Sequence, residues 1–106
     1  MKNKKSLLDT LRLLAEGQQK LALQALDAYE PLVTATIKNN NINQHEIEHL
    51  LDGMLDFCYD DAILVLYRKL CRYYFDINPA ATVDYIDLYR ERWDEDGKMN
   101  FKKTLP

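Results

Sequence analysis

Residues 6–28, SLLDTLRLLAEGQQKLALQALDA, carry the apolar pattern that decides the fold class. Apolar and uncharged residues follow one another at alternating steps of four and three, which is typical of a helical seam with a 3.5-residue period. The members of this seam are Leu7, Leu11, Leu14, Gln18, Leu21, Ala25 and Ala28. A parallel row at steps of seven widens the apolar face and consists of Leu8, Ala15, Ala22 and Tyr29. We therefore expect a long helix whose broad apolar side is covered by other helices.

The composition of the 106-residue chain fits one helical domain. Hydrophobic residues make up 47% and charged residues 29%, and the chain has only 3 Gly and 3 Pro. So few breakers favour long helices over a β-fold, which needs a turn every 8–12 residues or so. We predict an all-α fold, a bundle of four to five antiparallel helices with short loops. Its parts are a basic lead at residues 1–5, a single helical domain at 6–97 and a loose tail at 98–106.

Helix start and stop signals divide the rest of the chain. Pro31 either kinks the first helix or starts a new one, and we favour a short second helix that ends near Lys38. Asn43 opens the next helix, and Glu46, three residues later, completes a capping box. Further helices begin at Asp60-Asp61 and at Asn78-Pro79, and Gly97 ends the last one.

Charge and cysteine usage exclude several classes of protein. The formal net charge is −3, whereas nucleic-acid binding usually requires a basic surface, so a nucleic-acid partner is disfavoured. The longest apolar run, residues 62–67, is far shorter than the roughly 20 residues that span a bilayer. Cys58 and Cys71 lie in apolar helical stretches without the spacing of a disulfide framework or metal site. We expect a cytoplasmic protein with buried, inert thiols and no membrane segment.

The segment His45-Glu46-Ile47-Glu48-His49 matches the zinc-protease pattern H-E-x-x-H. Two histidines one helical turn apart can bind Zn²⁺, and the glutamate would be the general base. However, the chain has only 2 His, and the segment forms the first turn of its helix after a polar loop. We interpret it as an exposed polar turn, so we assign no metal, no cofactor and no catalytic residue. A metal-dependent hydrolase using His45, Glu46 and His49 is a remote alternative.

Aromatic residues gather in the second half of the chain, interleaved with arginines. At Tyr73-Tyr74-Phe75, three consecutive helical positions point 100° apart, so they cannot all face one core. The alternatives are a core role, a protein interface and stacking of single-stranded bases. The candidate interface residues are Tyr73, Tyr74, Phe75, Tyr89 and Trp93.

Two stretches bear a resemblance to known proteins. Residues 67–93 resemble the junction of a tetratricopeptide repeat, with Asp76-Ile77-Asn78-Pro79 at the turn and Tyr85, Leu88 and Tyr89 beyond it. They depart from that repeat at two positions that need small residues, and no second copy follows at the expected period. Residues 6–33 and 76–94 resemble small uncharacterised helical proteins carried on conjugative and other mobile elements of gut bacteria. That resemblance implies a bacterial cytoplasmic accessory protein and no site residues.

These observations lead to two main functional hypotheses. The first is a non-enzymatic helical interaction module that binds another protein or itself, because the apolar face of residues 6–28 is so wide. The alternative is an acidic inhibitor or immunity-type protein that neutralises a basic protein. Its acidic positions are Asp84, Asp87, Glu91, Asp94, Glu95 and Asp96.

Overall fold

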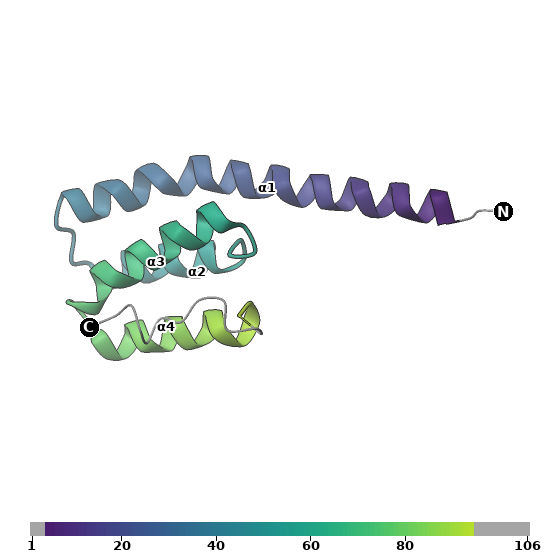
Figure 1. Ribbon diagram of the computed structural model, residues 1–106. Helices are drawn as coiled ribbons and strands as arrows, with labels where there is room; N and C mark the ends of the chain where they lie inside the picture. The colour runs from purple at the N-terminus through teal and green to yellow at the C-terminus, as the bar shows by residue number, and fades with distance from the viewer. Residues whose placement is uncertain (1–3, 95–106) are drawn as a thin grey trace.

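The computed structural model describes residues 4–94, with side chains from Leu7 onward, and this part of the chain is helical without strands. Its four helices are α1 (Lys4–Lys38), α2 (Gln44–Leu55), α3 (Asp61–Phe75) and α4 (Pro79–Arg92) (Figure 1). The all-α bundle predicted from the sequence is confirmed, and the number of helices lies at the lower end of the expected range. The helix expected from Ser6 begins at Lys4, two residues earlier.

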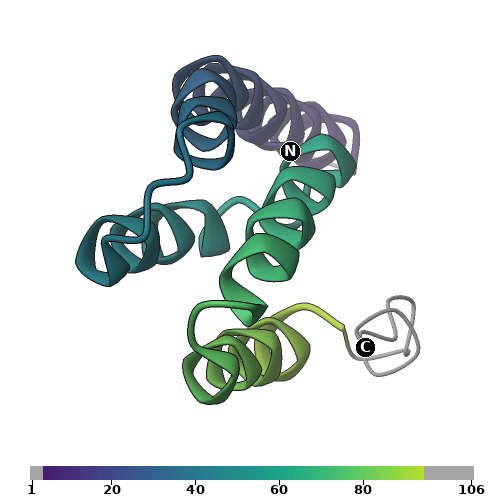
Figure 2. The ribbon, with the colours of Figure 1, turned by 90° about the vertical axis from the view of Figure 1, so that its left-hand side faces the viewer.

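Helix α3 is the centre of the bundle, since it contacts α1, α2 and α4 (Figure 2). Helices α1 and α4 lie on opposite sides of it. Most of the fully buried side chains come from α2 and α3, and the largest of them are Tyr67, Tyr74, Ile47, Leu51, Met54, Ile63 and Leu70. Val33, also fully buried, is the deepest contribution of α1 to this core.

The short second helix that we expected after Pro31 is wrong, because α1 continues through Pro31 to Lys38. Proline has no N–H to donate to the carbonyl of Asp27, four residues earlier. Pro31 is exposed, so water can hydrogen-bond that carbonyl on the outer side of α1. Burial of Val33, just beyond the proline, offsets the loss of the helical hydrogen bond.

The expected cover over the broad apolar side of the first helix is also wrong for its N-terminal half. Helix α1 has 35 residues, about 52 Å at 1.5 Å per residue, whereas the other helices have 12, 15 and 14 residues. Helices α2 and α3 pack against α1, mainly along its C-terminal half, where Ala22, Ala25 and Val33 are buried, and α4 packs against α3. The N-terminal half projects beyond the body of the molecule (Figure 1).

The predicted caps of the later helices are confirmed. The side chains of Asn43, Asp60 and Asn78 each accept hydrogen bonds from backbone N–H groups in the first turn that follows. The capping box at Asn43 differs in one respect: Glu46 does not return to the backbone of Asn43. Instead, Asn41 Nδ2 donates to Glu46 Oε1 at 2.8 Å, and the backbone N–H of Asn43 donates to Asn41 Oδ1 at 2.8 Å. Asn41 therefore links the loop to the start of α2.

Three expectations concern the ends of elements. Cys58 lies in the turn between α2 and α3 rather than in a helix, although its thiol is buried as expected and so is that of Cys71. The expected end of the last helix at Gly97 is wrong, because α4 ends at Arg92 and Trp93 is its C-cap. The tail at 98–106 lies outside the described residues, as does the capping side chain of Ser6. Among the described residues, no helix combines the length and apolar character that crossing a membrane requires.

Candidate interaction surface

Helix α1 carries a row of uncovered leucines, most of them in its projecting half. Five leucines at seam positions are each between 50% and 63% exposed, and the last of them continues the seam beyond Ala28 by one further step of four. We call these residues the exposed seam: Leu7, Leu11, Leu14, Leu21 and Leu32. Because they follow a 3.5-residue period, Leu7, Leu11, Leu14 and Leu21 lie along one side of α1, and Leu32 follows beyond the buried Ala25.

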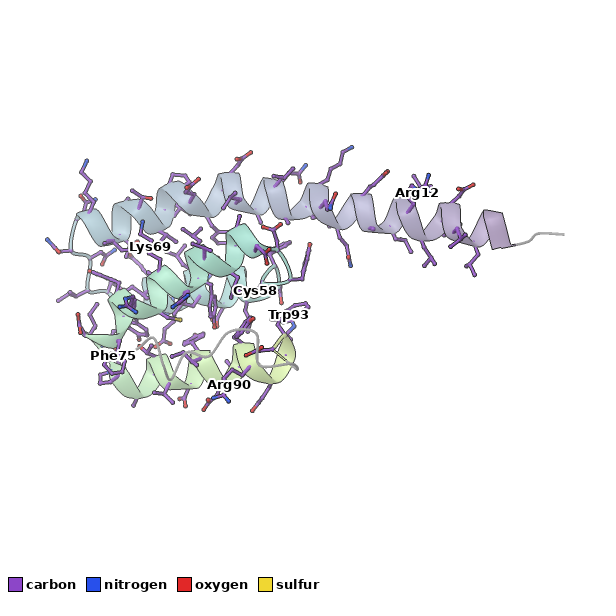
Figure 3. All side chains as sticks on the ribbon, in the orientation of Figure 1. Arg12, Cys58, Lys69, Phe75, Arg90 and Trp93 are labelled. Carbon is purple, nitrogen blue, oxygen red and sulfur yellow. The ribbon has the colours of Figure 1, made fainter. Side chains whose placement is uncertain are left out.

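The exposed seam is free of charge. At 100° per residue, the seam positions between residues 7 and 32 span an arc of roughly 100°, and no charged residue falls inside it. Both flanking rows are uncharged as well: Leu8, Ala15, Ala22 and Tyr29 on the side of the body, and Thr10, Gly17, Gln24 and Pro31 on the other. The charged side chains lie on the remaining faces, as Figure 3 shows for Arg12, on the side away from the body.

Two other exposed leucines of α1 do not belong to the seam. Leu13 is 68% exposed and Leu23 is 62% exposed, but the helical period places both outside the seam arc. Leu13 is the neighbour of Leu14 in the chain and has nearly the same exposure. It is therefore a matched control for any substitution in the exposed seam.

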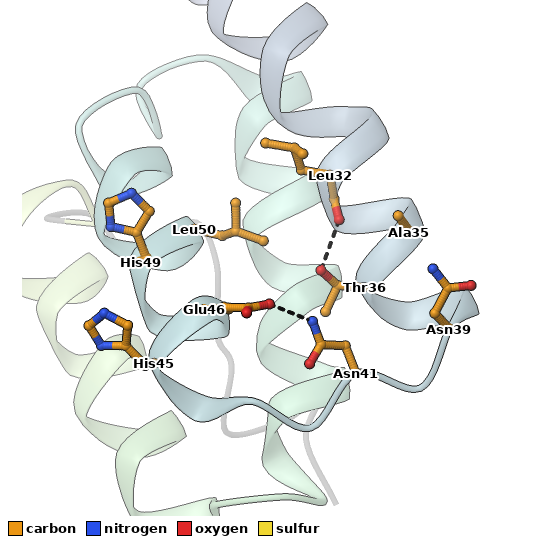
Figure 4. Close-up of a pocket in the computed structure, with 9 residues that line it drawn as sticks. All are labelled: Leu32, Ala35, Thr36, Asn39, Asn41, His45, Glu46, His49 and Leu50. Carbon is orange, nitrogen blue, oxygen red and sulfur yellow. Dashed lines mark hydrogen bonds between the residues drawn. The ribbon is translucent and has the colours of Figure 1, made fainter.

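A groove of about 460 Å³ lies at the C-terminal end of the exposed seam, between α1 and α2 (Figure 4). Leu32 from the seam and Leu50 from α2 form its apolar part, and Thr36, Asn41 and Glu46 add polar groups. Because Leu32 belongs to both features, the groove continues the seam towards the body of the molecule.

The His-Glu-x-x-His segment lies in the first turns of α2, where His45, Glu46 and His49 line the groove between α1 and α2. His45 and His49 are exposed and lie on the same side of α2, whereas Glu46 extends towards Asn41 and accepts its hydrogen bond (Figure 4). Glu48 accepts a hydrogen bond from the hydroxyl of Tyr74. Both carboxylates of the segment thus have partners inside the protein, and no group of three metal-ligating side chains occurs among the described residues.

Four of the five aromatic residues that we selected as interface candidates lie in the core or pack against it, and the fifth, Phe75, is partly exposed. Tyr74 and Tyr89 are buried. Tyr73, Phe75 and Trp93 are partly exposed, and two of these three donate to backbone carbonyls, Tyr73 to Asn41 at 2.7 Å and Trp93 to Leu55 at 2.8 Å. These contacts tie the loop before α2 to α3 and the end of α4 to α2. Tyr73, Tyr74, Tyr89 and Trp93 thus pack in or against the core, and uncovered leucines lie on α1.

The buried thiols are poor nucleophiles. Burial raises the pKa of Cys58 to about 12, against a smaller opposing effect from Arg92, and burial also raises the pKa of Cys71. The thiolate is the reactive form of cysteine, so both groups are protonated and unreactive at neutral pH.

The acidic positions on α4 do not form a surface of one sign. Asp84, Asp87 and Glu91 are exposed, but Arg90 lies among them and is exposed too. Arg92 pairs with Asp56 at 2.7 Å, which neutralises another acidic group at the end of α2. Glu95 and Asp96 lie outside the described residues.

Comparison of the chain with models of known protein families, with curated proteins and with solved structures finds no match.

Proposed function

We propose that this chain is a non-enzymatic helical interaction module and that the exposed seam of α1 is its binding surface. The observation that carries the proposal is the row of five seam leucines, each at least 50% exposed, with no charged residue in the seam or its flanking rows between residues 7 and 32. Single exposed apolar residues are ordinary on protein surfaces, whereas contiguous apolar patches usually mark interaction sites. A helix with such a stripe binds another helix or an apolar groove.

The surroundings of two carboxylates and two thiols support a role without catalysis. Glu46 and Glu48 accept hydrogen bonds from Asn41 and Tyr74, so both carboxylates take part in holding the loop and α3 against α2. The thiols of Cys58 and Cys71 are buried and protonated.

A single pair of variants tests the proposed surface. Leu14→Glu places a charge in the middle of the exposed seam, and Leu13→Glu places the same charge on a neighbouring, similarly exposed position outside it. We expect tagged wild-type chain and Leu13→Glu to capture a partner from host lysate in stoichiometric amounts, and Leu14→Glu to lose it. Equal capture by both variants would show that the seam is not the binding surface.

The same assay tests the acidic-inhibitor alternative, since Asp84 and Asp87 lie on a different helix from the seam. If that alternative is right, Asp87→Lys slows association with a basic partner at low salt, and Leu14→Glu has no effect.

A further inference from the structure

We infer that the partner of the exposed seam is a second copy of this chain, bound with the two α1 helices side by side and antiparallel. The inference rests on the proposed function, because it names the occupant of the same surface. A two-fold pair of this kind uses one patch on both copies, so the patch must be complementary to itself.

The charge distribution around the seam allows this self-complementarity. Identical helices that carry charges beside their contact bring like charges together in some registers. Here both flanking rows of the seam are uncharged from Leu8 to Pro31, so no such repulsion arises. A charged partner would also find no side chain of opposite charge beside the seam.

The sizes of the seam residues favour the antiparallel direction. Large residues fill the N-terminal part of the seam, where Leu7, Leu11 and Leu14 lie, and smaller ones such as Ala28 fill the C-terminal part. A parallel pair would place leucine on leucine and alanine on alanine. An antiparallel pair centred between Gln18 and Leu21 places Leu11 of one copy opposite the exposed Ala28 of the other, so at this pair a large residue meets a small one. The same register places Leu7 opposite Leu32, and Leu14 opposite Ala25, which the body of its own copy already buries.

In the same register, the dimer also covers the apolar row beside the seam. Leu8 is 60% exposed and lies in the row that faces the body along the C-terminal half of α1. In an antiparallel two-fold pair, both bodies lie on that side of the helix pair, at opposite ends. The body of one copy therefore covers Leu8 of the other, whereas a parallel pair leaves Leu8 in water.

The area available suits a reversible dimer. Burial of an exposed leucine removes on the order of 100 Å² of apolar surface. The five leucines of the exposed seam on both copies then bury on the order of 1,000 Å², which is near the lower limit for a specific interface. We therefore expect a dimer that dissociates on dilution.

Sedimentation of the purified full chain over a dilution series tests the dimer. We expect a concentration-dependent dimer in the wild type and, with a similar dissociation constant, in Leu13→Glu. Leu14→Glu, which alters the seam of both copies, should raise the dissociation constant by about 100-fold or more. A wild-type chain that remains monomeric at about 1 mM overturns the inference.

Cysteine cross-linking tests the direction of pairing, because the native thiols are buried and do not compete. The antiparallel register places Leu7 of one copy opposite Leu32 of the other. The double variant Leu7→Cys/Leu32→Cys should therefore form a covalent dimer on oxidation, and Leu7→Cys alone should not. Cross-linking of Leu7→Cys alone, or of neither variant, overturns the antiparallel register.

Failure of this inference is distinct from failure of the proposed function. If the chain is a monomer but Leu14→Glu still abolishes capture of a different protein, the seam binds that protein and the second-copy inference falls alone. If neither capture nor self-association responds to Leu14→Glu, both proposals fall.

Discussion

The end of the Tyr29 side chain, from α1, occupies the space directly over Gly53 of α2. A Cβ atom at position 53 would overlap the Tyr29 hydroxyl and lie only 2.8 Å from Cζ of the same ring. Glycine thus lets the aromatic ring rest against the backbone of α2. This contact joins the C-terminal half of α1 to α2.

Substitution of this glycine should therefore destabilise the fold. In Gly53→Ala, the gain of about 1 kcal/mol in helix propensity is opposed by displacement of the Tyr29 ring. Overpacking of this kind costs about 1–3 kcal/mol, so we expect a net loss of about 1 kcal/mol in the free energy of unfolding. Urea denaturation followed by circular dichroism measures it, in a Leu14→Glu background so that association does not contribute.

Gly17 provides the matched control, because it also lies inside a helix but has open space around it. Within the part of the chain that the structure describes, a Cβ atom at position 17 would meet no neighbouring atom within 4 Å. Gly17→Ala in the same background should leave the free energy of unfolding unchanged or raise it by up to about 1 kcal/mol. A loss of stability in Gly17→Ala equal to that of Gly53→Ala would refute the role assigned to Tyr29.

Replacement of the proline inside α1 should stabilise the monomer. Pro31→Ala restores an N–H that can donate to the carbonyl of Asp27, and position 31 is exposed, so no contact in the core is lost. We expect the free energy of unfolding to rise by about 1–2 kcal/mol in urea denaturation. A decrease would mean that a bend at Pro31 is required for α1 to contact α2 and α3 together.

The two thiols should report global unfolding. Burial holds the pKa of Cys58 at about 12 and raises that of Cys71, so both remain protonated and shielded in the native protein at neutral pH. We expect a chromogenic disulfide reagent to modify both cysteines only as fast as the chain unfolds, with the rate rising steeply in urea. Rapid native-state labelling of either thiol would contradict its burial.

Stability should fall at alkaline pH because of buried tyrosines. Burial and the hydrogen bond to Glu48 raise the pKa of Tyr74 to about 12, and burial also raises the pKa of Tyr67 and Tyr85. In the unfolded chain these phenols ionise near pH 10, so above about pH 10 the unfolded state binds fewer protons than the native state. The stabilisation is therefore complete below about pH 10 and declines as pH rises towards the native pKa values.

Thermal unfolding measured from pH 8 upward, together with tyrosinate absorbance, follows this decline. We expect the melting temperature to drop above about pH 10 and the drop to be smaller in Tyr74→Phe, which removes one of the ionising groups. Ionisation of all 7 tyrosines near pH 10 with the helices intact would contradict the raised pKa values.

Local chemistry made much of this structure predictable. The caps at Asn43, Asp60 and Asn78 followed from side chains that satisfy free N–H groups of the next turn, which depends on neighbouring residues alone. The apolar periods of α2 and α3 likewise identified their buried faces, including Ile47, Leu51 and Leu70. The aromatics of the second half could not be divided in this way, because Tyr73, Tyr74 and Phe75 have similar side chains and differ only in what surrounds them.

The helical class, the starts of the last three helices and the apolar seam of α1 could all be read from the chain, because propensity, capping and periodicity act within a few residues. The continuation of α1 through Pro31 depends instead on packing, since burial of Val33 against the other helices offsets the missing hydrogen bond. Packing also determines which seam positions are covered, since Ala25 is buried whereas the seam leucines are exposed. A periodic pattern shows that a face is apolar, but only the lengths and positions of the packed helices show that Leu7, Leu11 and Leu14 remain in water.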